Sequence, residues 1–522
     1  MKTMTYALAL SVSLLALGAN AADLVIGSST EPSAIDPQFS RTGNNQNIAM
    51  QIFDRLVQPD AKLGISPSLA ESYKNIDPTT WVVKLRDGVK FHDGKPVTSE
   101  DVIYSMTRAK DVPNSPAPFS GNVSAIASMK AIDSLTVEFK TKAPSPDFMD
   151  QVGFVYIMQK AISDGKPITE FNNGNAAIGS GPYKFKEWVP GGQVVLEKNA
   201  AYWGKKPEFD KVTIKFISNT AARVAALRSG AVDIIDAVTP EDAATLSAAG
   251  GIKLHSIPSA RLIYLALDMV RDETPFVTDA AGKPLTPNPL KKLEVRQALA
   301  KMVNAQLIVD RIVGGAGQVA AQLAPVGVAG SDPTLKQLPY NLNEAKKMLA
   351  DAGYPNGFGI TIHSSNDRFP GDGDVAQALG QMFARGGLKV NGVVTQPYNV
   401  YAGNASKQSF SAFVFSIGTT TPTTGNNLRN VFMTADKDAG TGSFNRIKYS
   451  NPAYDAKVKE ALSEFDTAKR DALLREATKM VFSDLPVIPL YWPTAVWASK
   501  DTIEYEANMS EDTSAALASL KK

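Results

Sequence analysis

Segment 81–106 constrains the fold of this chain most, because it carries signals for a strand, a tight turn and a helix in succession. Apolar residues take alternate positions on both sides of an Asp87-Gly88 pair: Trp81, Val83, Leu85, Val89 and Phe91. An Asp-Gly pair favours the positive φ angles of a hairpin turn. Thr98 has Asp101 three positions on, which is the spacing of a capping box at a helix start. The segment therefore predicts a β-hairpin that leads into a helix.

Strand-like and helix-like patterns alternate along the rest of the chain. Apolar residues at helical spacing predict long helices over 289–313 and 457–482, and Asn341 is placed to cap a further helix. Such alternation is typical of α/β domains. The chain has 522 residues, more than a single hydrophobic core organises, so roughly two or three domains are expected.

The first 21 residues have the pattern of a cleavable secretory leader. Lys2 supplies the positive charge, 6–17 is a short apolar run, and Ala19-Asn20-Ala21 matches a cleavage site, so the mature chain should begin at Ala22. A membrane anchor is the alternative, but a span needs about 20 apolar residues. The chain has no cysteine, which excludes disulfides, thiol chemistry and a lipid-anchored cysteine. We therefore expect an unanchored protein of the periplasm.

Composition and motifs argue against several classes of function. The formal net charge is only +2, so no basic excess points to nucleic acid as a partner. The three histidines lie far apart, and neither a phosphate-binding P-loop nor a Gly-x-Ser-x-Gly elbow is present. Asp367, Asp372 and Asp374 make calcium conceivable, but their spacing does not match an EF-hand, and a solvated loop is the alternative. We expect no cofactor, no metal site and no enzymatic activity.

Short blocks in a fixed order carry a resemblance to a known family. They are 31–37, 81–105, 179–183, 223–233, 295–299, 345–355 and 488–490. Each block is weak alone, but together and in this order the chain resembles the family 5 (peptide/nickel-type) extracytoplasmic solute-binding proteins of ABC transporters. The similarity covers essentially the whole chain after the leader.

This resemblance implies an α/β, two-lobed periplasmic binding protein fold (type II, cluster C) with an extra inserted domain. It places lobe I at 22–53, 180–259 and 488–522, the inserted domain at 54–179, and lobe II at 260–487. The lobes would close on a buried solute that is peptide-like or otherwise small and polar. A monomer would then deliver this ligand to the permease subunits of an ABC transporter. A periplasmic enzyme acting on such a solute and a chaperone-like peptide holder are the alternatives.

Two arginines are candidate contacts for an anionic group of the ligand. Arg368 lies where peptide-binding relatives carry an arginine for the ligand carboxylate, and a guanidinium suits two-bond carboxylate binding. A salt bridge from Arg368 to Asp367 or Asp372 is the structural alternative. Arg429, which follows a threonine-rich loop, is the second candidate.

The threonine-rich loop departs from the pattern of peptide-binding relatives. Those relatives hold the ligand's α-ammonium with an aspartate, but the matching position here is Thr420, and 410–430 contains no carboxylate. This departure disfavours a simple dipeptide as the ligand. We expect Thr419 and Thr420 to contact a polar ligand, unless their hydroxyls only satisfy the loop backbone. Further contacts are expected from lobe I and from one aromatic wall: Asn44, Asn45 and Tyr401. For Tyr401, as for Tyr398 and Trp492, core packing is the alternative.

Overall fold

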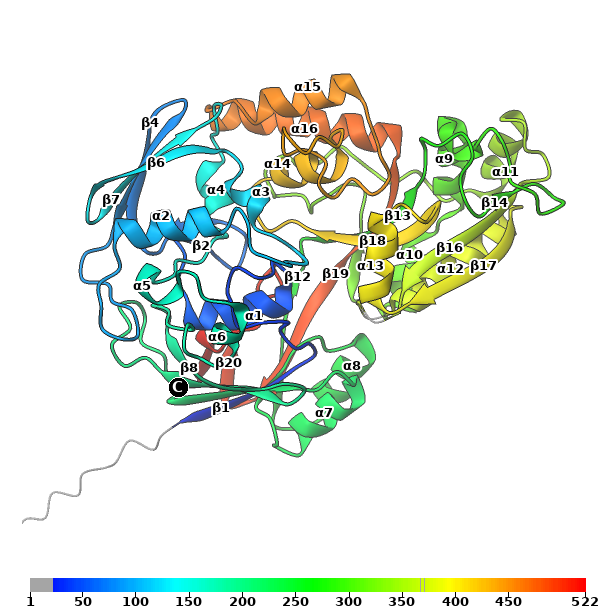
Figure 1. Ribbon diagram of the computed structural model, residues 1–522. Coiled ribbons are helices and arrows are strands. Elements are labelled where there is room, and N and C mark those ends of the chain that lie inside the picture. The colour runs from blue at the N-terminus through cyan, green and yellow to red at the C-terminus, as the bar shows by residue number, and fades with distance from the viewer. Residues whose placement is uncertain (1–21, 367, 370) are drawn as a thin grey trace, which may run out of the picture.

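A single long strand connects the two halves of the molecule. The computed structural model describes residues 22–366, 368–369 and 371–522, so the predicted leader and its cleavage site lie outside the described residues. Strand β19 (Val487–Lys500) pairs through its first part with β13 (Arg261–Leu267), and through its last part with β12 (Ile252–Pro258) and β11 (Ile234–Ile235). Figure 1 shows β19 running between the two halves. We call the half around β11 and β12 lobe I and the half around β13 lobe II.

Lobe I is a mixed sheet covered by helices on both faces. Strand β1 (Asp23–Ser28) pairs in parallel with β10 (Lys211–Phe216) and β11. The sheet continues antiparallel into β9 (Gln193–Lys198) and β8 (Tyr183–Val189). Helix α1 (Gly43–Ile52) packs in one hydrophobic core, and α7 (Thr220–Arg228) with α8 (Pro240–Ala248) in another. The C-terminal hairpin of β20 (Ile503–Tyr505) and β21 (Ala518–Leu520) joins the first core.

The inserted part has its own four-stranded antiparallel sheet and core. The strand order is β4 (Ala70–Asp77), β5 (Thr80–Leu85), β7 (Thr136–Thr141), β6 (Ile126–Asp133). Helices α2 (Ser99–Arg108), α3 (Ser120–Val123) and α4 (Phe148–Val152) contribute to its core. The smaller elements of this part are β2 (Val57–Pro59), β3 (Ile65–Pro67), α5 (Lys160–Ser163) and α6 (Ile168–Asn172).

The predicted hairpin around Asp87-Gly88 is wrong, whereas the helix after it is confirmed. Both edges of β5 are taken by β4 and β7, so segment 89–91 has no free strand edge to join. Its apolar residues are nevertheless buried beneath the sheet. The backbone N–H and the hydroxyl of Thr98 donate to Asp101 at 2.9 and 2.8 Å, at the start of α2.

Lobe II is a sheet with a separate hydrophobic core on each face. Its strands are β13, β14 (Val277–Thr278), β15 (Gly317–Val319), β16 (Gly359–Ser365), β17 (Lys389–Gln396) and β18 (Ala412–Gly418). One core holds α9 (Leu293–Met302), α11 (Leu342–Asp351) and α12 (Asp372–Arg385). The other holds α13 (Tyr398–Ser406), η3 (Leu428–Phe432), α15 (Pro452–Ala461) and α16 (Thr467–Asp484).

The two long helices predicted for lobe II are each interrupted. Segment 289–313 forms η1 (Pro289–Lys291), α9, α10 (Ala305–Leu307) and the π-helical η2 (Ile308–Ile312), because Val303 leaves the helical conformation. Segment 457–482 is divided between α15 and α16, and Asp466 caps the second helix by accepting from the Lys469 N–H at 2.8 Å. The predicted cap at Asn341 is confirmed: its side chain accepts from the Glu344 N–H at 3.1 Å.

Across the described part of the chain, none of the helices has both the length and the apolar character that a bilayer span requires.

Candidate functional site

The inserted part and lobe II touch where α4 meets η3. The Gln151 side-chain oxygen accepts from both terminal nitrogens of Arg429 at 3.4 and 3.3 Å. Phe465 of lobe II also packs against the core of the inserted part. In Figure 1, α3 and α4 face the end of lobe II that carries α14 (Gly425–Asn427). The two sides are therefore in contact in this conformation.

A set of arginines and carboxylates lies along the region where the two sides meet, and we call it the interlobe charge cluster. Its members are Arg41, Arg55, Arg261, Arg368, Arg429, Glu511 and Asp512. Each member acts electrostatically on at least one other, so the cluster is continuous from Arg41 in lobe I to Arg368 in lobe II. It contains five arginines and two carboxylates, and its formal charge is therefore positive.

The arginines at the lobe I end of the cluster lie close enough to repel one another. Burial, together with the charges of Arg429 and Arg55, lowers the pKa of Arg41 to about 10. The guanidinium of Arg41 lies over the ring of Phe154 at 5.2 Å. That of Arg55 lies over the Tyr156 ring at 4.2 Å. Aromatic faces compensate a positive charge only partly.

The two carboxylates of the cluster come from the loop after β20. Glu511 accepts from Arg261 Nη2 at 2.8 Å and from the Ser259 hydroxyl at 2.5 Å. Burial opposes ionisation of Glu511, but the charge and hydrogen bond of Arg261, the Ser259 hydroxyl and the charge of Arg368 together outweigh it and lower the pKa of Glu511. Glu511 has φ +64°, a left-handed conformation that costs energy in a residue with a side chain. Burial raises the pKa of Asp512 to about 6, although the charge of Arg55 acts in the opposite direction.

Arg368 lies at the lobe II end of the cluster and is half-buried. Its guanidinium lies over the Tyr398 ring at 5.1 Å. Burial, and next the charge of Arg261, lowers the pKa of Arg368. Its backbone N–H donates to the Asp372 carboxylate at 3.0 Å, which also accepts from the Ser365 hydroxyl at 2.6 Å. Asp372 thus holds the loop that presents Arg368, while Asp367, the other partner considered, lies outside the described residues.

Several guanidinium groups of the cluster are incompletely partnered. The Nε atoms of Arg41, Arg55 and Arg429 are buried without a hydrogen-bond acceptor among the described residues. None of these three, nor Arg368, forms an ion pair with a described carboxylate, whereas Arg261 pairs with Glu511. Because a buried charge needs a partner, this arrangement is suited to an anion.

The two threonines that were predicted to contact the ligand lie in different environments. Thr419 is buried, and its hydroxyl accepts from the Asn427 side chain at 3.1 Å while its N–H donates to the Ala260 carbonyl at 2.9 Å. Its polar groups therefore serve the loop, which was the alternative for this residue. Thr420 is half-buried and stays a predicted contact.

The asparagines predicted to face the ligand from lobe I bind their own loop instead. The Asn45 side chain is 2% exposed, accepts from Ser33 and donates to the Ala34 carbonyl at 3.1 Å. The Asn44 side chain donates to the Glu31 carbonyl at 2.5 Å. The structure thus gives Asn45 a structural role and leaves Asn44, which is half-buried, with part of its amide available.

The three aromatic candidates also differ in their environments. Tyr401 is 1% exposed, and its hydroxyl donates to the Val414 carbonyl between the Phe410 and Phe415 rings. It is a core residue, so we correct its assignment as a ligand contact. Trp492 is likewise buried in the second core of lobe II. Tyr398, beside Arg368, is half-buried and is the aromatic side chain placed to form a wall.

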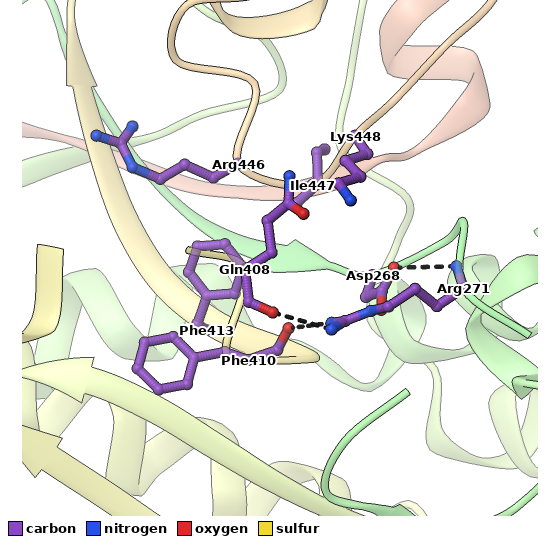
Figure 2. A pocket seen from close by; sticks show the side chains of 8 residues that line it. All are labelled: Asp268, Arg271, Gln408, Phe410, Phe413, Arg446, Ile447 and Lys448. Atoms are coloured by element: carbon purple, nitrogen blue, oxygen red, sulfur yellow. Dashed lines mark hydrogen bonds and ion pairs between the residues drawn. The ribbon is translucent and has the colours of Figure 1, made fainter. Parts of the chain in front are cut away.

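A small cavity in lobe II is not part of this site. It measures about 10 Å³, room for about one water molecule. Figure 2 shows Arg271 at this cavity donating to the carbonyls of Gln408 and Phe410, whereas Arg446 turns away from it. Arg271 also pairs with Asp268. The charges of Arg271 and Asp268 therefore neutralise each other.

Sequence reasoning missed most of the cluster, namely Arg41, Arg55, Arg261, Glu511 and Asp512. Arg41 stands two positions before the 43–45 segment that was expected to face the ligand, so its neighbourhood was a usable signal. No local pattern marks Glu511 or Asp512. Among the described residues, no group of three or more histidine, aspartate or glutamate side chains is arranged to hold a metal ion.

Comparisons with known proteins agree with this architecture. The family of bacterial extracellular solute-binding proteins, family 5 Middle, matches residues 64–439. The oligopeptide-binding protein AppA of Bacillus subtilis is 27% identical over 506 residues, which covers 92% of this chain and 88% of AppA. The glutathione-binding protein GsiB of Escherichia coli O157:H7 is 27% identical over 494 residues, 93% and 92% of the two chains.

A solved structure shares the fold over nearly the whole chain. The periplasmic binding protein DppA of Helicobacter pylori, in complex with the peptide STSA, aligns with a TM-score of 0.80 at 24% identity. The alignment covers 96% of this chain and 98% of that protein.

Proposed function

This chain belongs to the family 5 bacterial extracellular solute-binding proteins, which serve ABC importers, and we propose that its solute carries an acidic group bound by Arg368. The observation that carries this proposal is the state of Arg368. Its guanidinium is half-buried, lies against Tyr398 and has no ion-pair partner among the described residues. A carboxylate would supply that partner through two parallel hydrogen bonds.

We infer that the solute is peptide-like, or a related small polar molecule, but not a plain dipeptide. Two relatives are an oligopeptide-binding and a glutathione-binding protein. Thr420 offers a hydroxyl where peptide-binding relatives offer a carboxylate, so an α-ammonium there would lack a negative partner. Asp512, the cluster carboxylate that forms no ion pair among the described residues, is the substitute we propose. The excess of arginines in the cluster favours a solute of net negative charge.

The identity of the solute is open to a direct experiment. Native mass spectrometry of the protein as purified should detect a co-purified anion of small mass. A thermal-shift screen should then give larger shifts for acidic peptides and for acidic amino-acid conjugates than for neutral dipeptides. If neutral dipeptides gave the largest shifts and bound at micromolar concentration or tighter, the proposal for Thr420 and Arg368 would fail.

We propose that the lobes follow the expected limits: lobe I at 22–53, 180–259 and 488–522, the inserted domain at 54–179, and lobe II at 260–487. The pairing partner of β19 changes from β13 to β12 between Tyr491 and Thr494, which supports a boundary within this strand, a few residues after the proposed limit. We further propose that the chain works as a periplasmic monomer after cleavage before Ala22. Intact-mass analysis and light scattering of a periplasmic extract test both points.

Two other functions can be distinguished from solute binding by experiment. An enzyme would change the solute, whereas a binding protein returns it unchanged after incubation. A chaperone-like peptide holder would bind unfolded chains without selecting for size. We propose neither, because the interlobe charge cluster offers unpaired cations rather than a nucleophile with a base.

A further inference from the structure

We propose that Arg41, Arg55 and Arg429 form a second anion-binding subsite, so that the solute carries two acidic groups, one at this subsite and one at Arg368. The inference deepens the proposed function and rests on it for the class of solute. It concerns the opposite end of the interlobe charge cluster from Arg368.

Burial without partners is the first argument. Arg55 is 8% exposed, and its Nη2 donates to Gln46 at 2.9 Å and to the Tyr156 hydroxyl. Its Nε has no acceptor, and the same holds for the buried Nε of Arg41 and of Arg429, among the described residues. Three guanidinium groups thus each keep at least one buried N–H without a described acceptor. A bound oxyanion presents several acceptor oxygens and can satisfy all three.

The charge balance of the neighbourhood is the second argument. Within the described residues, the guanidinium of Arg429 donates to the neutral amide oxygens of Gln151 and Asn426 and to no carboxylate. The nearby carboxylate of Asp54 already accepts from Trp203, Ser180 and Tyr202 at 2.9, 2.9 and 3.1 Å. Asp512 acts on Arg55, but its own pKa is raised to about 6 by burial. Mutual repulsion of the three arginines is therefore poorly balanced from within the protein.

Arg261 supplies an internal comparison. It belongs to the same cluster, yet Glu511 binds its guanidinium at 2.8 Å and the Nε at 2.9 Å. Among the described residues, a carboxylate thus pairs with Arg261, and none pairs with the three arginines at the other end. Burial of uncompensated charge is costly, and a ligand anion removes that cost.

The origin of the three arginines indicates what the second acidic group would do. Arg41 precedes α1 and belongs to lobe I, whereas Arg55 follows α1 at the start of the inserted part, on the same side of the interface. Arg429 belongs to η3 of lobe II. An anion held between them attracts both lobes at once and stabilises their contact. The amide of Gln151, which now contacts Arg429, is neutral and cannot replace it.

Sodium sulfate is the first probe, because it is a divalent oxyanion that needs no assumption about the rest of the solute. We expect titration at constant ionic strength to show binding to the wild type. Arg41→Gln and Arg429→Gln should each weaken it about tenfold, the effect of losing one charge-assisted hydrogen bond. Arg385→Gln is the matched control, since Arg385 is exposed on α12. Sulfate binding of wild-type strength in both folded test variants would overturn the subsite.

A matched pair of tripeptides then tests the class of solute. Glu-Ala-Ala carries an acidic group at each end, and Gln-Ala-Ala lacks the one on its first side chain. The wild type should prefer Glu-Ala-Ala by about tenfold or more. This preference should vanish in Arg41→Gln and Arg429→Gln, whereas Arg368→Gln should weaken both peptides and keep their ratio. Equal affinity of the wild type for both peptides would contradict a second acidic group.

Failure of the proposed function has a different signature. If neither tripeptide bound but sulfate bound and responded to Arg41→Gln and Arg429→Gln, the subsite would stand and the peptide-like solute would be withdrawn. If both tripeptides bound equally and sulfate did not bind, the solute-binding role would stand and the second subsite would be withdrawn.

Discussion

Arg261 and Arg368 lie in one cluster, and their partners make them chemically different. Arg261 is neutralised by Glu511, a residue that adopts a left-handed conformation to reach it. Arg368 has an aromatic ring beneath its guanidinium and no described carboxylate bound to it. The first therefore ties the C-terminal loop of lobe I to β13, and the second is available to a ligand.

Truncation of Arg368 should weaken solute binding strongly. Removing one member of a buried charge pair costs about 2–5 kcal/mol, mostly because the other charge is left unpaired. Arg368→Ala should therefore weaken binding by roughly 30-fold or more. Arg368→Lys should restore only part of the lost affinity, because an ammonium cannot make the planar two-bond contact. Calorimetry with the co-purified solute measures both variants, and Arg385→Ala is the control. Wild-type affinity in a folded Arg368→Ala would remove Arg368 from the site.

Asp150 should make stability depend on pH. Burial, and next the charge of Asp147, raises the pKa of Asp150 to about 7, although Arg470 acts in the opposite direction. The folded state then holds this proton more tightly than the unfolded state does. The stabilisation that this proton contributes to the folded state is present below about pH 4 and is lost as the pH rises through about 7.

Asp150→Asn should therefore resemble the wild type at pH 4 and melt at a higher temperature than the wild type at pH 8. Thermal unfolding across this range measures the difference. Asp438→Asn, a change at an exposed carboxylate, should show no such trend. A constant difference in melting temperature between Asp150→Asn and the wild type would contradict the prediction.

At the scale of elements, short interruptions decide how the helices of lobe II pack. The chain leaves the helical conformation after α9 and again between α15 and α16. These breaks let α9 face one core of the sheet and let α15 and α16 lie together in the other. A pattern of apolar residues at helical spacing continues across both breaks, so periodicity alone does not reveal them.

Arg296 joins α9 to the end of α16, and its loss should destabilise lobe II. The side chain is 4% exposed and donates to the Asp484 carbonyl at 3.0 and 2.7 Å. It also donates to the Leu290 and Lys291 carbonyls, each at 2.9 Å. Arg296→Met would leave buried carbonyls without donors, at about 2–4 kcal/mol in total. Urea unfolding of this variant beside Arg385→Met checks the loss; equal stability of the two would contradict it.

At the scale of the whole molecule, two chain segments connect the lobes near each other. One is Ser259 and Ala260 between β12 and β13, and the other is the middle of β19. The Ser259 N–H donates to the Pro493 carbonyl at 2.9 Å, so the segments lie side by side. Farther from these segments, side chains join lobe II to the inserted part, as Arg429 and Gln151 do. This arrangement suits a hinge with a separable interface.

Solute binding should therefore make the protein more compact. An anion between Arg429 on one side and Arg41 and Arg55 on the other attracts the two sides, whereas without it their charges repel. Small-angle scattering should show a smaller radius of gyration at saturation with the co-purified solute than after its removal. Arg385→Gln should compact as the wild type does, and Arg429→Gln less. Identical dimensions with and without solute would count against closure at this hinge.

Local patterns in the sequence determined the α/β class, the start of α2 at Thr98 and the cap of α11 at Asn341, because each depends on residues a few positions apart. The blocks that resemble family 5 likewise identified the family correctly. The leader and the lobe limits stay predictions. Only the tertiary structure decided that segment 89–91 does not pair with β5, whose two edges are occupied, and that Tyr401 is covered by other aromatic rings.

The tertiary structure also brought Arg41, Arg261 and Glu511 into one charge cluster, across a sequence separation that no periodicity spans. The physical reason is the range of the interactions involved. Caps and alternation act between neighbours in the chain, whereas burial and charge pairing act between whichever residues packing brings together. Arg261 has a carboxylate partner, whereas none is described for Arg41 or Arg429. This difference is therefore a property of the fold rather than of any segment.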